Sequence, residues 1–228
     1  CERQGLSWSL RHARDRPPSM TAWSASNSNW SQQSECTAWK RCTSKLASSQ
    51  SLARSIVASW PDFRPTTLIG ALVQAGVDFV VIGGVAVVIQ ASPRFTRDLD
   101  ISYATDTANL ERLGALLVAL DARLRGVEDD LPFTPDARTL RHTQMLTLTT
   151  RDGDLDLLAD PPGSPGYPAL RRHADIVDLD GDSVRIASLE DLIEMKRAVG
   201  RPQDEIDIES LEVARSRIRG KRRKPDAR

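Results

Sequence analysis

Two aspartates separated by one residue, Asp98 and Asp100, carry the clearest chemical signal in the chain. They alternate with Leu99 and Ile101, so a strand would place both carboxylates on one face and both aliphatic side chains on the other. Two ionised carboxylates this close repel each other unless a cation lies between them. Divalent ions such as Mg²⁺ prefer oxygen ligands of this kind. The pattern indicates a metal site, although an isolated pair also suits a solvent-facing edge strand.

A third carboxylate strengthens the metal interpretation. Asp156 lies between Leu155 and Leu157 in a segment that we expect to pair in the same sheet. One face of the sheet would then collect three acids, which beside a phosphate site is the arrangement of two-metal phosphoryl transfer. Asp154 competes with Asp156 for the third position because both share one face of that strand.

A phosphate-binding turn is expected at Gly83-Gly84, which follows the apolar, β-branched run 77–82. Glycine lets backbone N–H groups approach a phosphate closely, and the start of a helix at 85–90 adds its positive dipole. Gly-Gly is also a common tight turn. The chain has neither a Gly-x-Gly-x-x-Gly fingerprint nor the Gly-Lys-Ser/Thr ending of a P-loop, so Rossmann and Walker sites lack support.

The periodicity of apolar residues predicts an α+β protein, with the catalytic candidates on or beside strands. Strands are predicted at 77–82, 98–101, 145–149 and 155–158, and the last two flank a hairpin turn at 151–153. Helices are predicted at 66–75, 85–90, 109–124, 188–198 and 205–218. Thr66 or Thr67 is the expected cap of the first helix, Ser188 has capping-box spacing to Asp191, and Arg201-Pro202 should end the helix that begins there.

Composition divides the 228 residues into two unlike parts, although the net charge is zero. Residues 1–60 hold eight basic and three acidic side chains, with all five tryptophans, all three cysteines and fourteen serines. We predict a non-globular Ser/Trp-rich extension there, either disordered or translated upstream of the native start, with a basic arm that stacks on single-stranded nucleic acid as the alternative. The predicted domains are a core at 61–185, a C-terminal helical segment at 186–218 and a basic tail at 219–228.

Several other classes are excluded by composition. Three cysteines at one end and three histidines do not give a zinc module or a disulfide scaffold. The chain has no run of eighteen apolar residues and no apolar segment typical of a signal peptide, so a cytoplasmic protein without a membrane partner is expected.

The order of the motifs resembles the DNA polymerase beta-type nucleotidyltransferase superfamily. The residues that carry this resemblance are Gly83-Gly84, then Thr96-Arg-Asp98-Leu-Asp100, then Asp156 on a later strand. Many members have Gly-Ser at the position of Gly83-Gly84. The resemblance implies a mixed β-sheet with flanking helices and a short C-terminal helical segment.

The C-terminal motifs narrow the resemblance to one branch of that superfamily. Leu192-Ile-Glu-Met-Lys196 and Arg201-Pro-Gln-Asp204-Glu-Ile-Asp207 are similar to segments of bacterial abortive-infection and toxin-like nucleotidyltransferases. In all, the resemblance covers roughly residues 66–211.

The activity that the resemblance implies is transfer of a nucleoside monophosphate from a nucleoside triphosphate, such as ATP, to an acceptor hydroxyl, with release of pyrophosphate. Two Mg²⁺ ions, or Mn²⁺, would be held by Asp98, Asp100 and Asp156. The catalytic residues would be these three acids and Lys196. The nucleotide-binding residues would be Gly83, Gly84, Thr96, Arg97, Lys196 and Asp204.

The acceptor stays open at this point: an RNA end, a protein hydroxyl or a small molecule such as an aminoglycoside would all suit the site. The basic run 221–224 favours RNA, and the toxin-like branch implies a cognate antitoxin protein as partner. One alternative is a non-catalytic module of a toxin–antitoxin pair. A haloacid dehalogenase-type phosphatase is a weaker one, because Arg94-Phe-Thr-Arg97 precedes Asp98 where that family has an apolar run. An EF-hand loop is excluded, since Tyr103 and Asn109 replace its glycine and glutamate.

Overall fold

The computed structural model describes residues 63–127 and 133–222, with the backbone alone for Lys221 and Arg222. The predicted extension at 1–60 and the end of the predicted basic tail, 223–228, lie outside the described residues. None of the helices in the described part of the chain combines the length and the apolar character that a membrane span requires.

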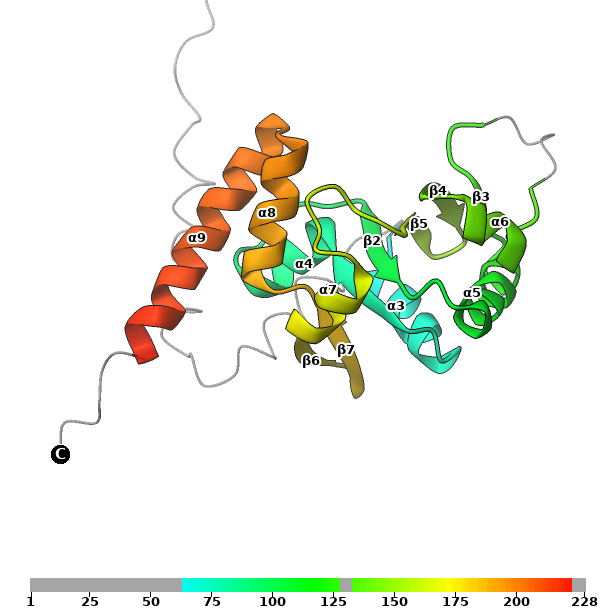
Figure 1. Ribbon diagram of the computed structural model, residues 1–228, viewed down its shortest axis with the longest axis horizontal. Coiled ribbons are helices and arrows are strands. Elements are labelled where there is room, and N and C mark those ends of the chain that lie inside the picture. Colours follow the sequence, from blue (N-terminus) through cyan, green and yellow to red (C-terminus); the bar gives the residue numbers. More distant parts are fainter. Residues whose placement is uncertain (1–62, 128–132, 223–228) are drawn as a thin grey trace, which may run out of the picture. The chain divides into compact units, whose positions relative to one another are not determined.

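A mixed sheet of seven strands forms the centre of the described fold, in the order β3-β4-β5-β2-β1-β7-β6 (Figure 1). The strands are β1 (Phe79–Ile82), β2 (Asp98–Tyr103), β3 (Arg123–Leu124), β4 (Met145–Thr150), β5 (Gly153–Leu158), β6 (Asp175–Leu179) and β7 (Asp182–Ile186). Strand β2 runs antiparallel to β1 and parallel to β5, while β4 and β5 form the predicted antiparallel hairpin. The predicted α+β class with a mixed sheet is confirmed.

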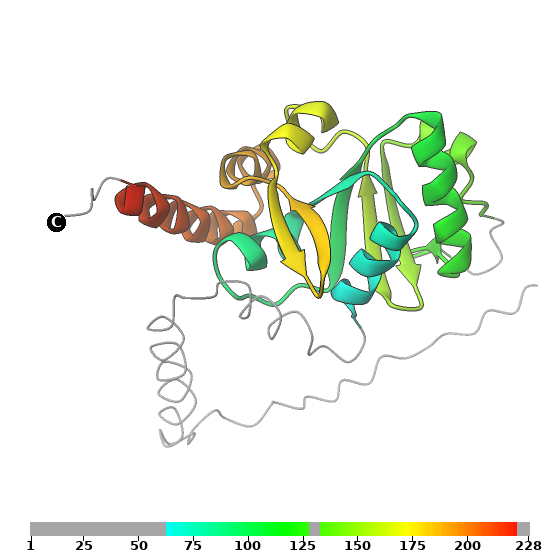
Figure 2. The ribbon, with the colours of Figure 1, turned by 90° about the horizontal axis from the view of Figure 1, so that it is seen from below.

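Seven helices accompany the sheet within the described residues (Figure 2). They are α3 (Pro65–Gln74), α4 (Gly83–Gln90), α5 (Thr107–Ala119), α6 (Ala137–His142), α7 (Tyr167–His173), α8 (Leu189–Val199) and α9 (Pro202–Arg222). Helices α8 and α9 pack against each other and against α4, which also contacts β1 and β2. The C-terminal helices therefore reach the sheet at the point where the acidic strand and the diglycine meet.

The alternation predicted for the acidic strands is present in both of them. Leu99 and Ile101 of β2 and Leu155 and Leu157 of β5 are fully buried in the hydrophobic core. The aspartates between them therefore project from the opposite face of the sheet. Burial of these four aliphatic side chains fixes the register of β2 and β5, since a slip by one residue would move all of them to the acidic face of the sheet.

The predicted start of α3 and the predicted end of α5 are wrong. Helix α3 begins at Pro65 with Arg64 at the N-cap and no side-chain cap, so neither Thr66 nor Thr67 caps it. Proline is favoured at the first helical position because its fixed φ suits the helix and its missing N–H is not needed there. Helix α5 ends at Ala119 rather than near residue 124, because the chain turns at Asp121 and then forms β3.

The boundaries of α8 follow the prediction. Ser188 is the N-cap and accepts a hydrogen bond from the Asp191 backbone N–H, while its hydroxyl donates to the Asp191 carboxylate. Gly200 ends the helix in a left-handed conformation, and Pro202 opens α9. Helix α9 is longer than the predicted 205–218 and continues to Arg222, because arginine and lysine favour helices and suit the C-terminal dipole. The first four residues of the predicted tail are therefore helical.

Candidate active site

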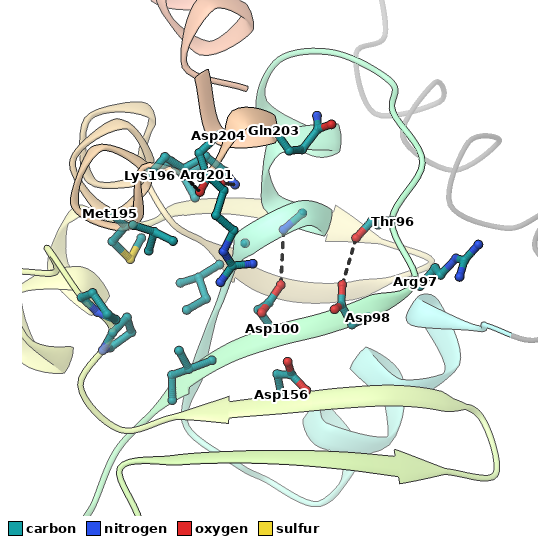
Figure 3. A pocket seen from close by; sticks show the side chains of 18 of the residues that line it. Thr96, Arg97, Asp98, Asp100, Asp156, Met195, Lys196, Arg201, Gln203 and Asp204 are labelled. Atoms are coloured by element: carbon teal, nitrogen blue, oxygen red, sulfur yellow. Dashed lines mark hydrogen bonds and ion pairs between the residues drawn. The ribbon is translucent and has the colours of Figure 1, made fainter. Parts of the chain in front are cut away.

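The parallel pairing of β2 with β5 brings the predicted acids together. Asp100 lies directly opposite Asp156, and Asp98 lies opposite Asp154. Asp98, Asp100 and Asp156 all line one cavity of about 370 Å³, in which Figure 3 shows their carboxylates directed to the same side of the sheet. Asp154 does not line this cavity and instead accepts a hydrogen bond from the Thr149 hydroxyl (2.9 Å). The geometry thus favours Asp156 over Asp154 as the third acid.

The diglycine turn lies against Asp100. Gly83 has a φ of +60°, and a Cβ atom at this position would overlap the Asp100 carboxylate. The Gly84 N–H donates a hydrogen bond to Asp100 Oδ2 at 3.3 Å. A Cβ on Gly84 would in turn overlap the Thr96 hydroxyl. Both positions need glycine because the acid and the threonine approach the start of α4 this closely.

Asp100 is the most electrostatically perturbed of the acids. Burial, with added repulsion from Asp98 and Asp156, raises the pKa of Asp100 to about 7. The Gly84 N–H and the Lys196 charge act in the opposite direction but do not cancel the effect. A cation held next to Asp100 would therefore favour its ionised form.

Asp156 is paired with an arginine that the sequence analysis did not single out. Arg125 Nη2 lies 2.8 Å from each oxygen of Asp156, and Arg125 Nη1 lies 3.1 Å from Asp154. The Asp156 side chain is only 8% exposed. Burial raises its pKa, although the Arg125 guanidinium lowers it. The third acid is thus a nearly buried carboxylate that already has a cationic partner.

The donor chemistry of the site fits a hard divalent ion. Asp98, Asp100 and Asp156 offer carboxylate oxygens, the ligands that Mg²⁺ and Mn²⁺ prefer. Within residues 63–127 and 133–222, however, no three histidine, cysteine or acidic side chains are already arranged around one metal position. The contacts of Arg125 with both oxygens of Asp156 agree with this observation.

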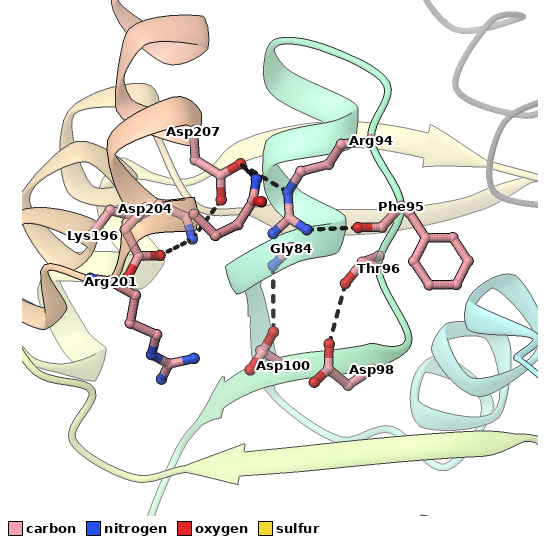
Figure 4. A network of polar contacts seen from close by, with 11 residues as sticks. Gly84, Arg94, Phe95, Thr96, Asp98, Asp100, Lys196, Arg201, Asp204 and Asp207 are labelled. Carbon is pink, nitrogen blue, oxygen red and sulfur yellow. Dashed lines mark hydrogen bonds and ion pairs between the residues drawn. The ribbon is translucent and has the colours of Figure 1, made fainter. Parts of the chain in front are cut away.

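Lys196 is placed in the cavity by a network of charges that joins α8, α9 and the loop before β2 (Figure 4). Its Nζ lies 2.7 Å from Asp204 Oδ1 and 2.8 Å from Asp207 Oδ2. Asp207 is 1% exposed and also pairs with Arg94 Nε at 2.9 Å. Burial works against ionisation of Asp204, but Lys196 and the backbone N–H of Arg201 together lower the pKa of its carboxyl. Lys196, Asp204 and Asp207 are therefore largely buried and paired with one another, and they do not form a solvated helix surface.

Arg94, in the loop before β2, belongs to the same network through its ion pair with Asp207. It lines the cavity, and its guanidinium donates to the Phe95 carbonyl at 2.8 Å. No motif in the sequence indicates this role of Arg94, since a single arginine in a loop has no regular spacing to the aspartates of a distant helix.

Thr96 and Arg97 have different positions. The buried Thr96 hydroxyl donates to Asp98 Oδ1 at 3.1 Å and lines the cavity next to Gly84. Arg97 also lines the cavity, but its guanidinium lies over the ring of Phe95, 5.2 Å from the centroid, and Figure 3 shows it directed away from the aspartates. Thr96 thus belongs to the acidic centre and Arg97 to its rim.

The cavity also has apolar lining residues that the sequence did not indicate. These residues come from β4, β5, the loop after β5 and α8, and they are Met145, Leu158, Pro161, Pro162, Leu192, Met195 and Val199. Arg201 extends into the cavity toward Asp100 (Figure 3). A pocket with apolar lining residues and a few convergent charges is typical of a small-molecule site.

Comparison with known proteins gives structural matches only. No family model matches the chain, and no curated protein does. Among similar solved structures, the antibiotic-resistance factor ANT(2'')-Ia has 19% identity and a TM-score of 0.40 over 68% of this chain and 91% of its own. An antigenic nucleotidyltransferase-like protein from Paracoccidioides brasiliensis has 19% identity and a TM-score of 0.43 over 71% and 75%.

A putative nucleotidyltransferase from Thermotoga maritima has 15% identity and a TM-score of 0.38 over 69% of this chain and 96% of its own. Such low identities and TM-scores do not bear on activity. The function has to be argued from the site.

Proposed function

We propose that the protein is a metal-dependent nucleotidyltransferase, which moves a nucleoside monophosphate from a nucleoside triphosphate to an acceptor hydroxyl. The observation that carries the proposal is the convergence of Asp98, Asp100 and Asp156 in one cavity with the Gly83-Gly84 turn. Three carboxylates beside a glycine turn at a helix N-terminus combine a site for divalent ions with a site for phosphate.

The binding of the triphosphate would use the backbone of the diglycine turn and the positive side chains around it. The turn lies at the first residues of α4, where the helix dipole favours anions. Arg201 and Lys196 line the same cavity and would contribute charge to the phosphate oxygens. The apolar lining residues, which include Leu158 and Pro161, would accommodate a base or an acceptor ring.

The reaction would be an in-line displacement at the α-phosphorus. The acceptor hydroxyl releases its proton to solvent and its oxygen forms the new bond to the α-phosphorus, while the bond from the α-phosphorus to the β-phosphate oxygen breaks and pyrophosphate leaves with the electron pair. Mg²⁺ or Mn²⁺, when bound at Asp98, Asp100 and Asp156, polarises the phosphoryl oxygens and lowers the pKa of the acceptor hydroxyl. Lys196, held by Asp204 and Asp207, would stabilise charge that develops on the oxygens.

The finer parts of the proposal concern the acceptor and the biological setting. RNA, a protein hydroxyl and an aminoglycoside-like small molecule remain the three acceptor classes. Membership of the toxin-like branch and a cognate antitoxin partner are predictions from the sequence motifs alone. A binding module without turnover is the alternative function.

The experiment that tests the proposal is incubation of the protein with each α-labelled nucleoside triphosphate, Mg²⁺ and one acceptor class at a time. Label should reach an acceptor with the unmodified protein and with Asp121→Asn, a control at an exposed carboxylate. Transfer should be lost in Asp98→Asn and Asp100→Asn. Label recovered in nucleoside diphosphate, nucleoside monophosphate or free phosphate without an acceptor product would instead indicate a phosphatase, and no turnover with any acceptor would favour the binding module.

A further inference from the structure

The Arg125 side chain forms an ion pair with Asp156, one of the acids that line the cavity, and a second one with Asp154. One of its terminal nitrogens contacts both oxygens of Asp156 at 2.8 Å, and the other contacts Asp154 at 3.1 Å. Such a contact is a charge-assisted interaction with fixed geometry. Because Asp156 is almost buried, its carboxylate has little water to replace this partner.

The sheet register explains why Arg125 reaches the acid. Arg123 pairs with Thr149 and Leu124 with Leu148, and the Arg125 N–H then donates to the Thr147 carbonyl at 3.0 Å. Thr147 is in turn the neighbour of Asp156, and Asp156 is the neighbour of Asp100. A single row across the sheet thus runs from Arg125 over Thr147 to the two acids. The backbone holds Arg125 in line with the acidic centre.

This position makes the arginine a competitor for any cation that needs Asp156. Both oxygens of the carboxylate accept hydrogen bonds from one guanidinium nitrogen, so a divalent ion at Asp156 would have to compete with this positive charge. Asp98 has a different partner, the Thr96 hydroxyl, and Asp100 accepts only a weak backbone hydrogen bond of 3.3 Å. Among the described residues, Asp98 and Asp100 therefore have no cationic partner in an ion pair that an incoming ion must compete with, whereas Asp156 is already paired with Arg125.

We propose that Arg125 is the resident counter-cation of the third acid, and that a divalent ion is bound through Asp156 only when it displaces Arg125. The inference deepens the proposed function and rests on it. Arg125 is here a positioning residue that sets the affinity of one ion, while an ion at Asp98 and Asp100 does not depend on it.

The test measures Mn²⁺ binding to the nucleotide-free protein. Electron paramagnetic resonance and titration calorimetry monitor the binding at about 0.15 M salt, where surface charges are screened. Arg125→Gln should tighten the ion that depends on Asp156 by at least about fivefold, the lower end of typical coupling between sites. The Mn²⁺ affinity of Arg125→Lys should lie between that of the unmodified protein and that of Arg125→Gln, because a lysine keeps the charge but does not contact both oxygens of Asp156.

Two controls separate this competition from a general effect of charge. Arg123→Gln removes the same charge two residues earlier, where the side chain pairs with the exposed Asp121, and it should leave Mn²⁺ binding unchanged. In an Asp156→Asn background, Arg125→Gln should have no effect on Mn²⁺ affinity. Such a double-mutant cycle isolates the coupling between the arginine and the acid.

The inference is overturned if Arg125→Gln binds Mn²⁺ no more tightly than the unmodified protein, or if neither protein binds Mn²⁺. It is also overturned if Arg125→Gln still raises the Mn²⁺ affinity in the Asp156→Asn background. Should Arg125→Gln fail to fold by circular dichroism, the same comparison with Arg125→Lys decides the matter. Failure of the proposed function would give a different result: Mn²⁺ would compete with Arg125 for Asp156 as expected, but no nucleotide would be transferred to any acceptor.

Discussion

The carboxylate of Asp100 occupies the space that a Cβ atom on Gly83 would need. Gly83→Ala must therefore displace the acid or the start of α4, in addition to the strain of about 1–2 kcal/mol for a non-glycine residue at positive φ. We expect a loss of about a hundredfold in transfer activity, since a shift of about 1 Å at a reacting centre has an effect of this size. Initial rates with labelled nucleotide measure it.

The control for backbone strain is Gly76→Ala. Gly76 has a similar φ of +68°, but a Cβ there would meet only the Arg112 side chain at ordinary contact distance. This variant should lose stability in a thermal melt while it keeps its activity. Equal activity losses in the two variants would show that the contact between Gly83 and Asp100 has no special importance.

Asp100 also predicts how stability depends on pH in the absence of metal. Its pKa is about 7 in the folded protein, whereas the ordinary pKa of an aspartate is 3.8, so between these limits the folded state binds the proton more tightly than the unfolded state. The contribution of this group to the free energy of unfolding therefore falls as the pH rises from about 4 to 7.

Asp100→Asn should remove this fall in the free energy of unfolding with rising pH. With a chelator present, we expect the variant to be more stable than the unmodified protein by at least about 1 kcal/mol at pH 8, since one pKa unit corresponds to about 1.4 kcal/mol. The difference should shrink toward pH 5, where Asp100 is protonated. Thermal melts across this range test the sign, and a difference that grows toward low pH would contradict it.

The acidic strands could be predicted from the sequence because their signal is local. Leu99 and Ile101 must be buried, so the residues between them must face the other way, and no knowledge of the partner strand is needed. The cap at Ser188 and the predicted break at Arg201-Pro202 are local for the same reason. Short-range rules therefore located the two carboxylates and the lysine helix.

Arg125 shows why the rest could not be predicted. It lies 31 residues from Asp156 in the chain, and only the register of β3, β4 and β5 puts it in line with the acid. Strand β3 has two residues, too few for any periodicity, and the helical spacing of leucines in α5 concealed its start. The link between Arg94 and Asp207 is equally a product of tertiary packing.

Lys196 has a structural role that can be separated from its proposed contact with phosphate. Lys196→Met leaves Asp204 without its cationic partner and Asp207 with Arg94 alone, so we expect a loss of stability on the order of 3 kcal/mol. The double variant Lys196→Met with Asp204→Asn should regain part of that stability without regaining activity. Chemical denaturation and transfer assays on both variants provide the comparison.

The matched control is Arg197→Met, which removes a charge from the next residue, where the side chain is half exposed and pairs with Glu194 and Glu212. Its effect on stability should stay within about 1 kcal/mol, as is usual for exposed ion pairs. If the double variant recovers activity together with stability, Lys196 acts only through folding.

The Thr96 hydroxyl lies where a side chain at position 84 would begin, and it donates to Asp98. Gly84→Ser alone should therefore reduce nucleotide affinity, because the new side chain overlaps Thr96. Thr96→Ala alone should also reduce it, through loss of the hydrogen bond to Asp98, by about fivefold for a contribution of about 1 kcal/mol.

The double variant Gly84→Ser with Thr96→Ala should lose less nucleotide affinity than the two single losses added together, because the new Cβ atom at position 84 then takes the space that the threonine hydroxyl vacates. Equilibrium binding of a fluorescent nucleoside triphosphate measures the four affinities of this cycle. Additive losses would mean that a side chain at position 84 and the Thr96 hydroxyl do not compete for one space, which would contradict the prediction.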